Sequence, residues 1–100
     1  MNVVAKLSRS ESTDNYDRVV ARLNDRWRVI ECQHRLQWIL QYRASAETYA
    51  TARWQGRSYC RTSQALRRCS REHAGAIDPD AAAVLAALPQ WLEGDLTAAA

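Results

Sequence analysis

Residues 35–43 (RLQWILQYR) alternate between two kinds of side chain, and this alternation constrains the fold more than any other feature of the sequence. The apolar set comprises Leu36, Trp38, Leu40 and Tyr42, and the other set comprises Arg35, Gln37, Ile39, Gln41 and Arg43. Successive side chains of a β-strand point to opposite faces of the sheet, so a period of two predicts a half-buried strand. We expect the apolar set to pack against helices and the polar set to face water.

Two flanking segments are expected to pair with this strand. Residues 26–32 (RWRVIEC) are rich in β-branched and aromatic side chains, and the short link at residues 33–34 fits a hairpin. Residues 52–61 (ARWQGRSYCR) provide a third strand, in which Gly56 indicates a bulge or a close approach of the backbone. These segments predict a three-stranded antiparallel sheet.

Helices are expected before and after the sheet. Residues 13–24 carry one helical stripe of apolar side chains with two acids in the first turn. Residues 64–73 form a second candidate helix, capped by Thr62 or Ser63 and stopped by Gly75. The Asp-Pro-Asp run at residues 78–80 starts a third, which Pro89 kinks or ends.

The chain length and composition fit one small domain, because a hundred residues bury a single core. Phe is absent and Val, Ile and Leu number only 18, so the four tryptophans are expected mostly in the core. The sequence predicts an α+β domain over residues 13–94, with an N-terminal helix, a three-stranded antiparallel sheet, and two C-terminal helices packed on one sheet face. Residues 1–12 are expected to form a flexible arm and residues 95–100 a frayed tail.

The net charge of +3 conceals a strongly basic centre. Residues 26–73 hold ten arginines against three glutamates, whereas residues 74–100 hold acids and no base. The guanidinium group pairs bidentately with phosphate or carboxylate, which lysine cannot do. High-GC codon usage is an alternative explanation for arginine in place of lysine, but it does not explain the clustering.

The polar face of the sheet and the outer face of the second helix are therefore candidate binding surfaces. Their candidate residues are Arg35, Gln37, Arg43, Arg53, Arg57, Tyr59, Arg61, Arg67, Arg68 and Arg71. Arginine neutralises phosphate, glutamine pairs with adenine, and tyrosine stacks on bases, so this composition favours nucleic acid. An ordinary solvated sheet face and a site for an acidic protein surface remain open alternatives.

A metal site and catalysis have weaker support. Cysteine and histidine occur at Cys32, His34, Cys60, Cys69 and His73, but their spacing matches no zinc signature. Dispersed cysteines of this kind are typical of buried, reduced thiols. No nucleophile elbow or phosphate-binding loop is present in the sequence. We expect a non-enzymatic protein without a metal or other cofactor.

Residues 26–73, and above all WQGRSYCRTSQALRRCSREH, resemble the three-stranded-sheet-plus-helix layout of the arm-site-binding domains of tyrosine integrases and of plant ethylene-response-type DNA-binding domains. In those families the third strand runs into a Thr-capped helix with Ala and Leu inside, as Thr62, Ala65 and Leu66 are placed here. The segments RWRVIEC, QWILQYR and RSYCRT more loosely resemble small uncharacterised proteins of alphaproteobacterial plasmids and prophages. The second resemblance implies a mobile genetic element, in which DNA-binding accessory proteins and anti-defence inhibitors such as anti-CRISPR proteins both occur.

The expected partner is accordingly nucleic acid, or in the alternative an acidic surface of a protein effector complex that the chain blocks. No stretch approaches the run of about 18 apolar residues that a membrane helix needs, so a cytoplasmic protein without a membrane partner is expected. A homodimer that pairs through an exposed sheet edge is also possible.

Overall fold

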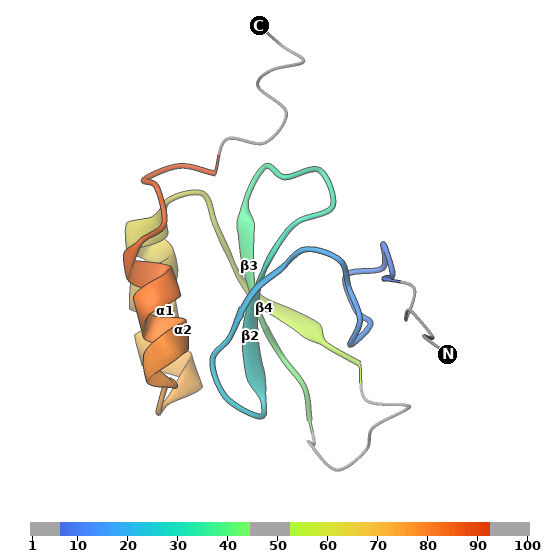
Figure 1. The fold of residues 1–100 in the computed structure, drawn as a ribbon, viewed down its shortest axis with the longest axis horizontal. Coiled ribbons are helices and arrows are strands. Elements are labelled where there is room, and N and C mark those ends of the chain that lie inside the picture. Colours follow the sequence, from blue (N-terminus) through green and yellow to red (C-terminus); the bar gives the residue numbers. More distant parts are fainter. Residues whose placement is uncertain (1–6, 45–52, 93–100) are drawn as a thin grey trace, which may run out of the picture.

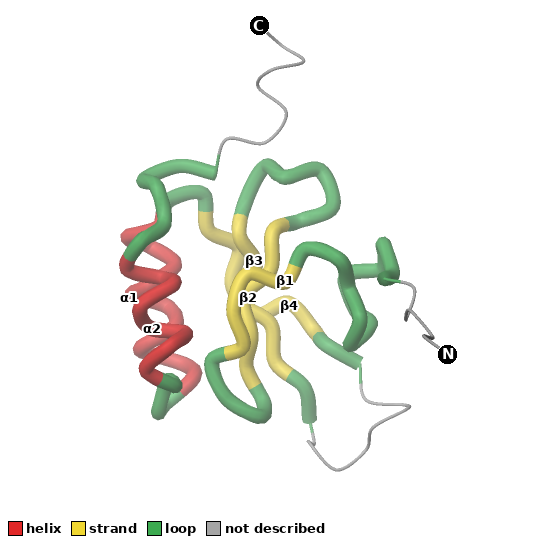
Figure 2. The backbone as a smooth tube through the Cα atoms, viewed as in Figure 1, coloured by secondary structure: helices red, strands yellow, loops and turns green. Residues whose placement is uncertain are grey.

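The computed structural model describes residues 7–44 and 53–92, and it shows a small α+β fold of two layers (Figure 1). The elements are β1 (Val19–Arg22), β2 (Trp27–Glu31), β3 (Trp38–Tyr42), β4 (Gln55–Cys60), α1 (Ser63–Ala74) and α2 (Pro79–Ala86). Both helices cover one side of the sheet, and the segment that precedes β1 lies on the other side (Figure 2). None of the helices in these two ranges is long and apolar enough to cross a membrane.

The sheet is an antiparallel meander with the strand order β1-β2-β3-β4. The central ladder of β2 and β3 is regular and pairs Val29 with Leu40 and Ile30 with Ile39. The register shifts in β1 after Val19, and it shifts again where β4 pairs with β3. The irregular pairings therefore lie at the two edge strands and leave the centre of the sheet intact.

The first strand corrects the expectation of an N-terminal helix and of only three strands. Residues 19–22 form β1, which pairs with β2 through contacts such as Val19 with Ile30. The side chain of Asn24 turns the chain, because its Oδ1 accepts the backbone N–H groups of Arg26 (2.9 Å) and Trp27 (3.0 Å). Two adjacent β-branched valines also favour a strand over a helix. The apolar residues that fit a helical stripe thus belong to a strand and to the turn that follows it.

The link between β2 and β3 is longer than the expected two residues and spans residues 32–37. The turn places Arg35 at φ 58°, and the Arg35 N–H donates to the carbonyl of Cys32 at 2.8 Å. Leu36 therefore lies outside β3 and is exposed, in contrast to its expected position against the helices. Trp38 and Leu40 confirm the expected alternation, because both are buried in the core that the helices cover.

The two helices confirm the local signals that predicted them. Thr62 caps α1, since its Oγ1 accepts the N–H of Ala65 at 3.1 Å, and Gly75 ends the helix at φ 72°. Pro79 stands in the first turn of α2, which ends before Pro89. The core beneath the helices contains Val29, Trp38, Leu40, Leu66 and Leu85. Trp91 is 53% exposed and lies outside this core, which corrects its expected burial.

The opposite face of the sheet is covered by residues 8–18, of which residues 8–12 were expected in a flexible arm. Tyr16 packs with Ile30, Cys32 and Ile39 in a second apolar cluster, and its hydroxyl donates to the carbonyl of Glu31 at 2.8 Å. Burial, with the nearby charges of two carboxylates, raises the pKa of Tyr16 to about 12, so this donor stays protonated. The remaining parts of the expected arm and tail, residues 1–6 and 95–100, lie outside the described residues.

Candidate nucleic-acid interface

The ten candidate residues divide among four places and do not form one continuous sheet face. The β2–β3 loop holds Arg35 and Gln37, Arg43 follows β3, Arg53, Arg57, Tyr59 and Arg61 lie on or beside β4, and Arg67, Arg68 and Arg71 lie on α1. Tyr59 pairs in register with Ile39, which belongs to the cluster on the side away from the helices. The residues of α1 and the side chain of Tyr59 therefore lie on opposite sides of the sheet.

The largest polar side chain buried on the sheet is Arg28. Arg28 is fully buried, and its guanidinium donates to Gln41 Oε1 at 2.7 Å and to the carbonyls of Glu11 (3.0 Å) and Thr13 (2.9 Å). Gln41 is buried as well, and its Nε2 donates to the same Glu11 carbonyl at 2.9 Å. The segment before β1 thus occupies this part of the polar face with its own backbone carbonyls.

Trp54 forms the centre of a cation–π cluster beside Arg28. The guanidinium carbons of Arg28, Arg43 and Arg22 lie 4.4, 4.7 and 5.6 Å from the centroid of its ring. The indole Nε1 donates to Asp14 Oδ1 at 3.1 Å, and the same carboxylate pairs with Arg22 at 3.0 Å. Burial of Trp54 confirms its expected place in a core, although this core lies on the face away from the helices.

Arg43 is a structural residue of this cluster and was wrongly expected to face water. Its side chain is only 15% exposed, and Nη1 lies 3.4 Å from Asp14 Oδ1. Its Nε donates to the carbonyl of Asp25 at 2.8 Å. The segment before β1 covers Arg43 and the rest of this cluster. The one sequence signal for this contact is the acidic stretch of residues 11–17, whose carboxylates complement the basic strands.

Three guanidinium groups around one ring repel each other, and the electrostatics reflect this crowding. Burial, with the charges of Arg22 and Arg43, lowers the pKa of Arg28 to about 10, which still leaves it protonated at neutral pH. Asp14 is the carboxylate that reduces the repulsion among these three positive charges. Burial pushes the pKa of Asp14 upward, but hydrogen bonds from Trp54 and Arg22 and the charges of Arg22 and Arg43 bring it below 3.8.

The lowered pKa of Asp14 predicts a loss of stability in acid. The folded protein binds the Asp14 proton less tightly than the unfolded chain, so this contribution is present above about pH 4 and disappears as the pH falls. Asp14→Asn should remove that pH dependence. The contribution is less than about 1 kcal/mol, because Asp14 is half-exposed. Urea unfolding of both proteins at about pH 6 and about pH 3 measures it. An equal acid-dependent loss in both would contradict the assignment to Asp14.

The residues of the β2–β3 loop are also engaged within the fold. Arg35 Nε lies 3.4 Å from Glu31 Oε1, and the backbone carbonyl of Gln37 accepts the N–H of Cys32 at 2.9 Å. Both side chains are half-buried. This loop therefore offers less free positive charge than the alternating pattern implied.

Four of the six exposed candidate residues lie on or beside β4, an edge strand of the sheet, and the other two lie on α1. Within residues 7–44 and 53–92, the guanidinium groups of Arg57 and Arg61 are exposed and have no hydrogen-bond or ion-pair partner. Arg53 is exposed and donates from Nη1 to Ser12 Oγ at 3.0 Å. Arg57 falls at the register shift between β3 and β4, where the neighbouring positions of β4 pair with Leu40 and Gln41.

Tyr59 lies along β4 because Gly56 leaves room for its ring. A Cβ atom at Gly56 would come within 2.8 Å of Tyr59 Cζ, so any side chain there would displace the phenol. Tyr59 is 61% exposed, as its expected surface position requires. The bulge or close approach that Gly56 indicated is therefore confirmed, both by the register shift and by the contact with Tyr59.

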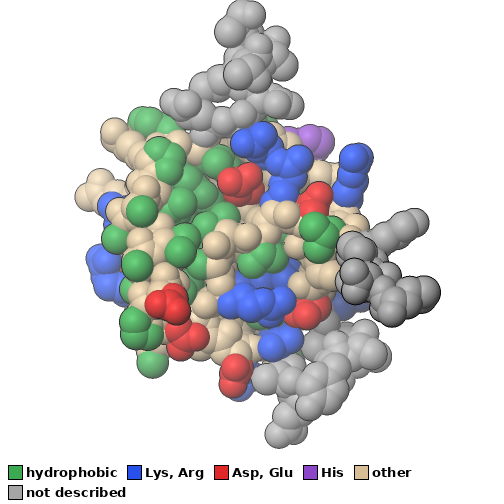
Figure 3. All heavy atoms as spheres, in the orientation of Figure 1, with side chains coloured by type: hydrophobic (Ala, Val, Ile, Leu, Met, Phe, Trp, Pro, Cys, Tyr) green, Lys and Arg blue, Asp and Glu red, His purple; other side chains and the backbone are tan. Residues whose placement is uncertain are grey.

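The arginines of α1 have different surroundings from one another. Arg67 donates to the carbonyl of Leu85 at 3.3 Å and thereby ties α1 to α2. Arg68 is exposed and faces Glu72 at 4.0 Å, one turn further along the helix. Arg71 is exposed and lines, with Arg67, a shallow hollow of about 130 Å³ whose remaining walls are apolar. Figure 3 shows hydrophobic side chains gathered over the helices, and mixed charges beside the sheet.

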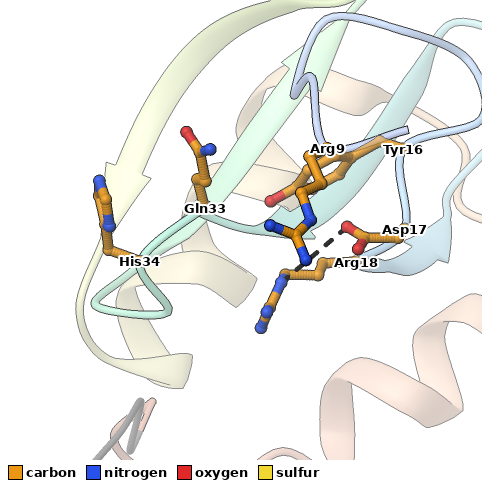
Figure 4. A pocket seen from close by; sticks show the side chains of 6 residues that line it. All are labelled: Arg9, Tyr16, Asp17, Arg18, Gln33 and His34. Carbon is orange, nitrogen blue, oxygen red and sulfur yellow. Dashed lines mark ion pairs between the residues drawn. The ribbon is translucent and has the colours of Figure 1, made fainter. Parts of the chain in front are cut away.

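A polar hollow that was not predicted lies beside the start of β1. Its volume is about 280 Å³, and it is lined by Arg9, Tyr16, Asp17, Arg18, Gln33 and His34 (Figure 4). Arg9, Asp17 and Arg18 converge in it, whereas Gln33 and His34 extend away from them. Arg18 Nε lies 3.9 Å from Asp17 Oδ1, so one of the two guanidinium groups is already paired with a carboxylate.

The fold separates the residues that a zinc site would need. Cys32 packs on the side away from the helices, whereas Cys60 and Cys69 pack in the core beneath them. Among the residues that the structure describes, no three His, Cys, Asp or Glu side chains gather as metal ligands.

The surface that best fits an external anion is therefore the outer part of β4. We call it the β4 surface and define it as Arg53, Arg57, Tyr59 and Arg61. Comparison of the chain with protein-family models, curated proteins and solved structures found no match.

Proposed function

We propose that this protein binds nucleic acid, and that the β4 surface makes the contact. The observation that carries the proposal is the exposure of Arg57 and Arg61, which have no acceptor among the described residues, on either side of an exposed tyrosine. A guanidinium group without an internal partner is available to a phosphate, which accepts two parallel hydrogen bonds from it.

The order of residues along β4 favours a single strand over a duplex. Arg57 and Arg61 are four residues apart, which corresponds to about 13 Å in an extended chain. Tyr59 lies between them in the sequence and presents its ring to solvent. A base of a single strand is free to stack on such a ring while the flanking phosphates contact arginines, whereas the bases of a duplex are already stacked.

The other basic residues support this surface without forming part of it. Arg28 and Arg43 direct their donors to groups of the fold, so they are not available to a ligand. Arg68 and Arg71 lie on the helix layer and contribute a positive potential that assists the approach of a polyanion. In this proposal the β4 surface contacts the nucleic acid, and the arginines of α1 attract it from a distance.

Charge reversal on the two sheet edges tests the proposal. Arg57→Glu and Arg61→Glu should each weaken the binding of a labelled single-stranded oligonucleotide about tenfold or more at low salt, because each removes a phosphate contact. Arg18→Glu makes the same change in net charge just before β1, which is the opposite edge strand. It should weaken binding much less. Fluorescence anisotropy measures all three affinities, with circular dichroism as the check on folding.

Tyr59→Ala separates stacking from charge in the same assay. It should weaken single-strand binding by about 1–3 kcal/mol and duplex binding by less. Equal losses in Arg18→Glu and Arg57→Glu would show attraction by net charge without a β4 contact. A wild-type protein that binds neither DNA nor RNA at low salt would contradict the proposal altogether.

A further inference from the structure

Two cysteines meet where β4 runs into α1. Cys60 is the last residue of β4 and is buried, and Cys69 lies on the following helix and is half-buried. Both side chains belong to the core beneath the helices, where the Cys69 thiol neighbours that of Cys60. The connection between the two residues is short, and α1 packs directly on β4.

We propose that Cys60 and Cys69 are a disulfide-forming pair, which a peroxide oxidises to an intramolecular bond between β4 and α1. This site is independent of nucleic-acid binding and does not rest on it. Both thiols lie where α1 packs on β4 in one core, so bond formation requires that the two sulfur atoms approach to covalent distance.

The two thiols differ in their exposure to solvent, and this difference determines which of them reacts first with the peroxide. Cys69 is the more exposed, so its thiolate attacks the peroxide, becomes a sulfenic acid, and releases one water. The sulfur of Cys60 then attacks the sulfenic sulfur and displaces its oxygen, which leaves with the Cys60 proton as a second water. Two thiols and one hydrogen peroxide thus yield one disulfide and two waters.

The surroundings of Cys60 favour its reaction in the second step, with the sulfenic acid, over a direct reaction with the peroxide. Burial, together with the neighbouring Cys69 thiol, raises the pKa of Cys60 to about 11, so it stays protonated until its neighbour is oxidised. A thiol of this kind does not react with oxidants in solution, because the thiolate is the nucleophile. Its position against Cys69 allows it to trap the sulfenic acid before further oxidation.

The third cysteine provides a control within the same chain. Cys32 is buried in the cluster with Tyr16 and Ile39, on the opposite side of the sheet from the pair. Its Sγ accepts the N–H of Leu36 at 3.1 Å. Neither of the other two cysteines packs in this cluster as far as the structure describes the chain, so Cys32 should remain a thiol under the same treatment.

Peptide mapping tests the pairing directly on the full-length protein. The reduced protein is treated with a small molar excess of hydrogen peroxide, alkylated under denaturing conditions, and digested with trypsin. Cleavage after arginine separates residues 58–61 (SYCR), 69–71 (CSR) and 29–35 (VIECQHR), so each cysteine lies in its own peptide. We expect residues 58–61 and 69–71 as one linked species from monomeric protein, reversed by dithiothreitol, with Cys32 alkylated.

Two cysteine variants provide controls for the peptide mapping of the wild-type protein. Cys32→Ser should form the same linked species as the wild type. Cys60→Ser should leave Cys69 without a partner, so that peroxide takes Cys69 to the sulfinic acid. Alkylation of both Cys60 and Cys69 after peroxide, sulfinic acid at Cys69 in the wild type, or linkage through Cys32 at an equal level would each overturn the proposal.

Discussion

Arg28→Ala is expected to lower the free energy of unfolding by about 3–5 kcal/mol, because it removes a fully buried guanidinium group together with its four hydrogen bonds. The guanidinium of Arg28 satisfies Gln41 Oε1 and the carbonyls of Glu11, Thr13 and Asp14. It also stacks on Trp54. Without it, the segment before β1 loses three of the hydrogen bonds that hold it on the sheet.

Chemical unfolding followed by tryptophan fluorescence measures this effect. Arg28→Lys should give an intermediate loss, since lysine keeps the charge but lacks the planar fork that reaches several carbonyls at once. Arg57→Ala is the matched control on an exposed arginine and should change stability by less than about 0.5 kcal/mol. A loss below about 1 kcal/mol for Arg28→Ala would show that water replaces the guanidinium, contrary to its complete burial.

Trp54→Ala is expected to cost a similar amount, about 3–5 kcal/mol, because it leaves a cavity in the face covered by residues 8–18. The indole is almost fully buried, and it supports three guanidinium groups while it donates to Asp14. Trp54→Phe keeps an aromatic face and loses the donor, so its loss should be smaller. Trp91→Ala, at an exposed tryptophan, is the control and should have little effect.

The same measurements on the double variant show whether Trp54 and Arg28 act as one unit. The two side chains are in contact, so their effects should differ from additivity by about 0.5 kcal/mol or more. Strict additivity, or a loss at Trp54 no larger than at Trp91, would contradict the structural role of the cation–π cluster.

Local signals in the sequence predicted the parts of the fold that depend on neighbouring residues. The caps of α1 at Thr62 and Gly75 concern hydrogen bonds and dihedral angles within one or two turns. The burial of Trp38 and Leu40 follows from the strand period itself. These features require no knowledge of distant parts of the chain.

The segment before β2 was mispredicted because its structure depends on contacts that are distant in the sequence. Val19 and Val20 fit a helical stripe, but β2 offers them strand pairing, and Asn24 closes the turn between the two strands. The polar side of β3 was expected to be open to water for the same reason. The backbone around Glu11 covers this side of β3, because its carbonyl accepts hydrogen bonds from the side chains of Arg28 and Gln41. These contacts are known only from the folded structure.

The candidate site was predicted in part for a related reason. Alternation shows which side chains leave the main core, but it does not distinguish an arginine that meets solvent from one that meets another segment. Arg43 and Arg67 bind groups of the fold, whereas Arg57 and Arg61 remain exposed. Charge clustering therefore indicated a basic region of the chain, and tertiary packing decides which of its arginines are exposed.

The salt dependence of oligonucleotide binding tests the proposed β4 surface most directly. For the wild type, the logarithm of the binding constant should fall linearly with the logarithm of the salt concentration. Arg57→Glu combined with Arg61→Glu should reduce the slope by about 1.4, which corresponds to two lost phosphate contacts on a single strand. Arg18→Glu should leave the slope close to that of the wild type. A slope unchanged by the double substitution would show that β4 does not contact the phosphates and would contradict the account.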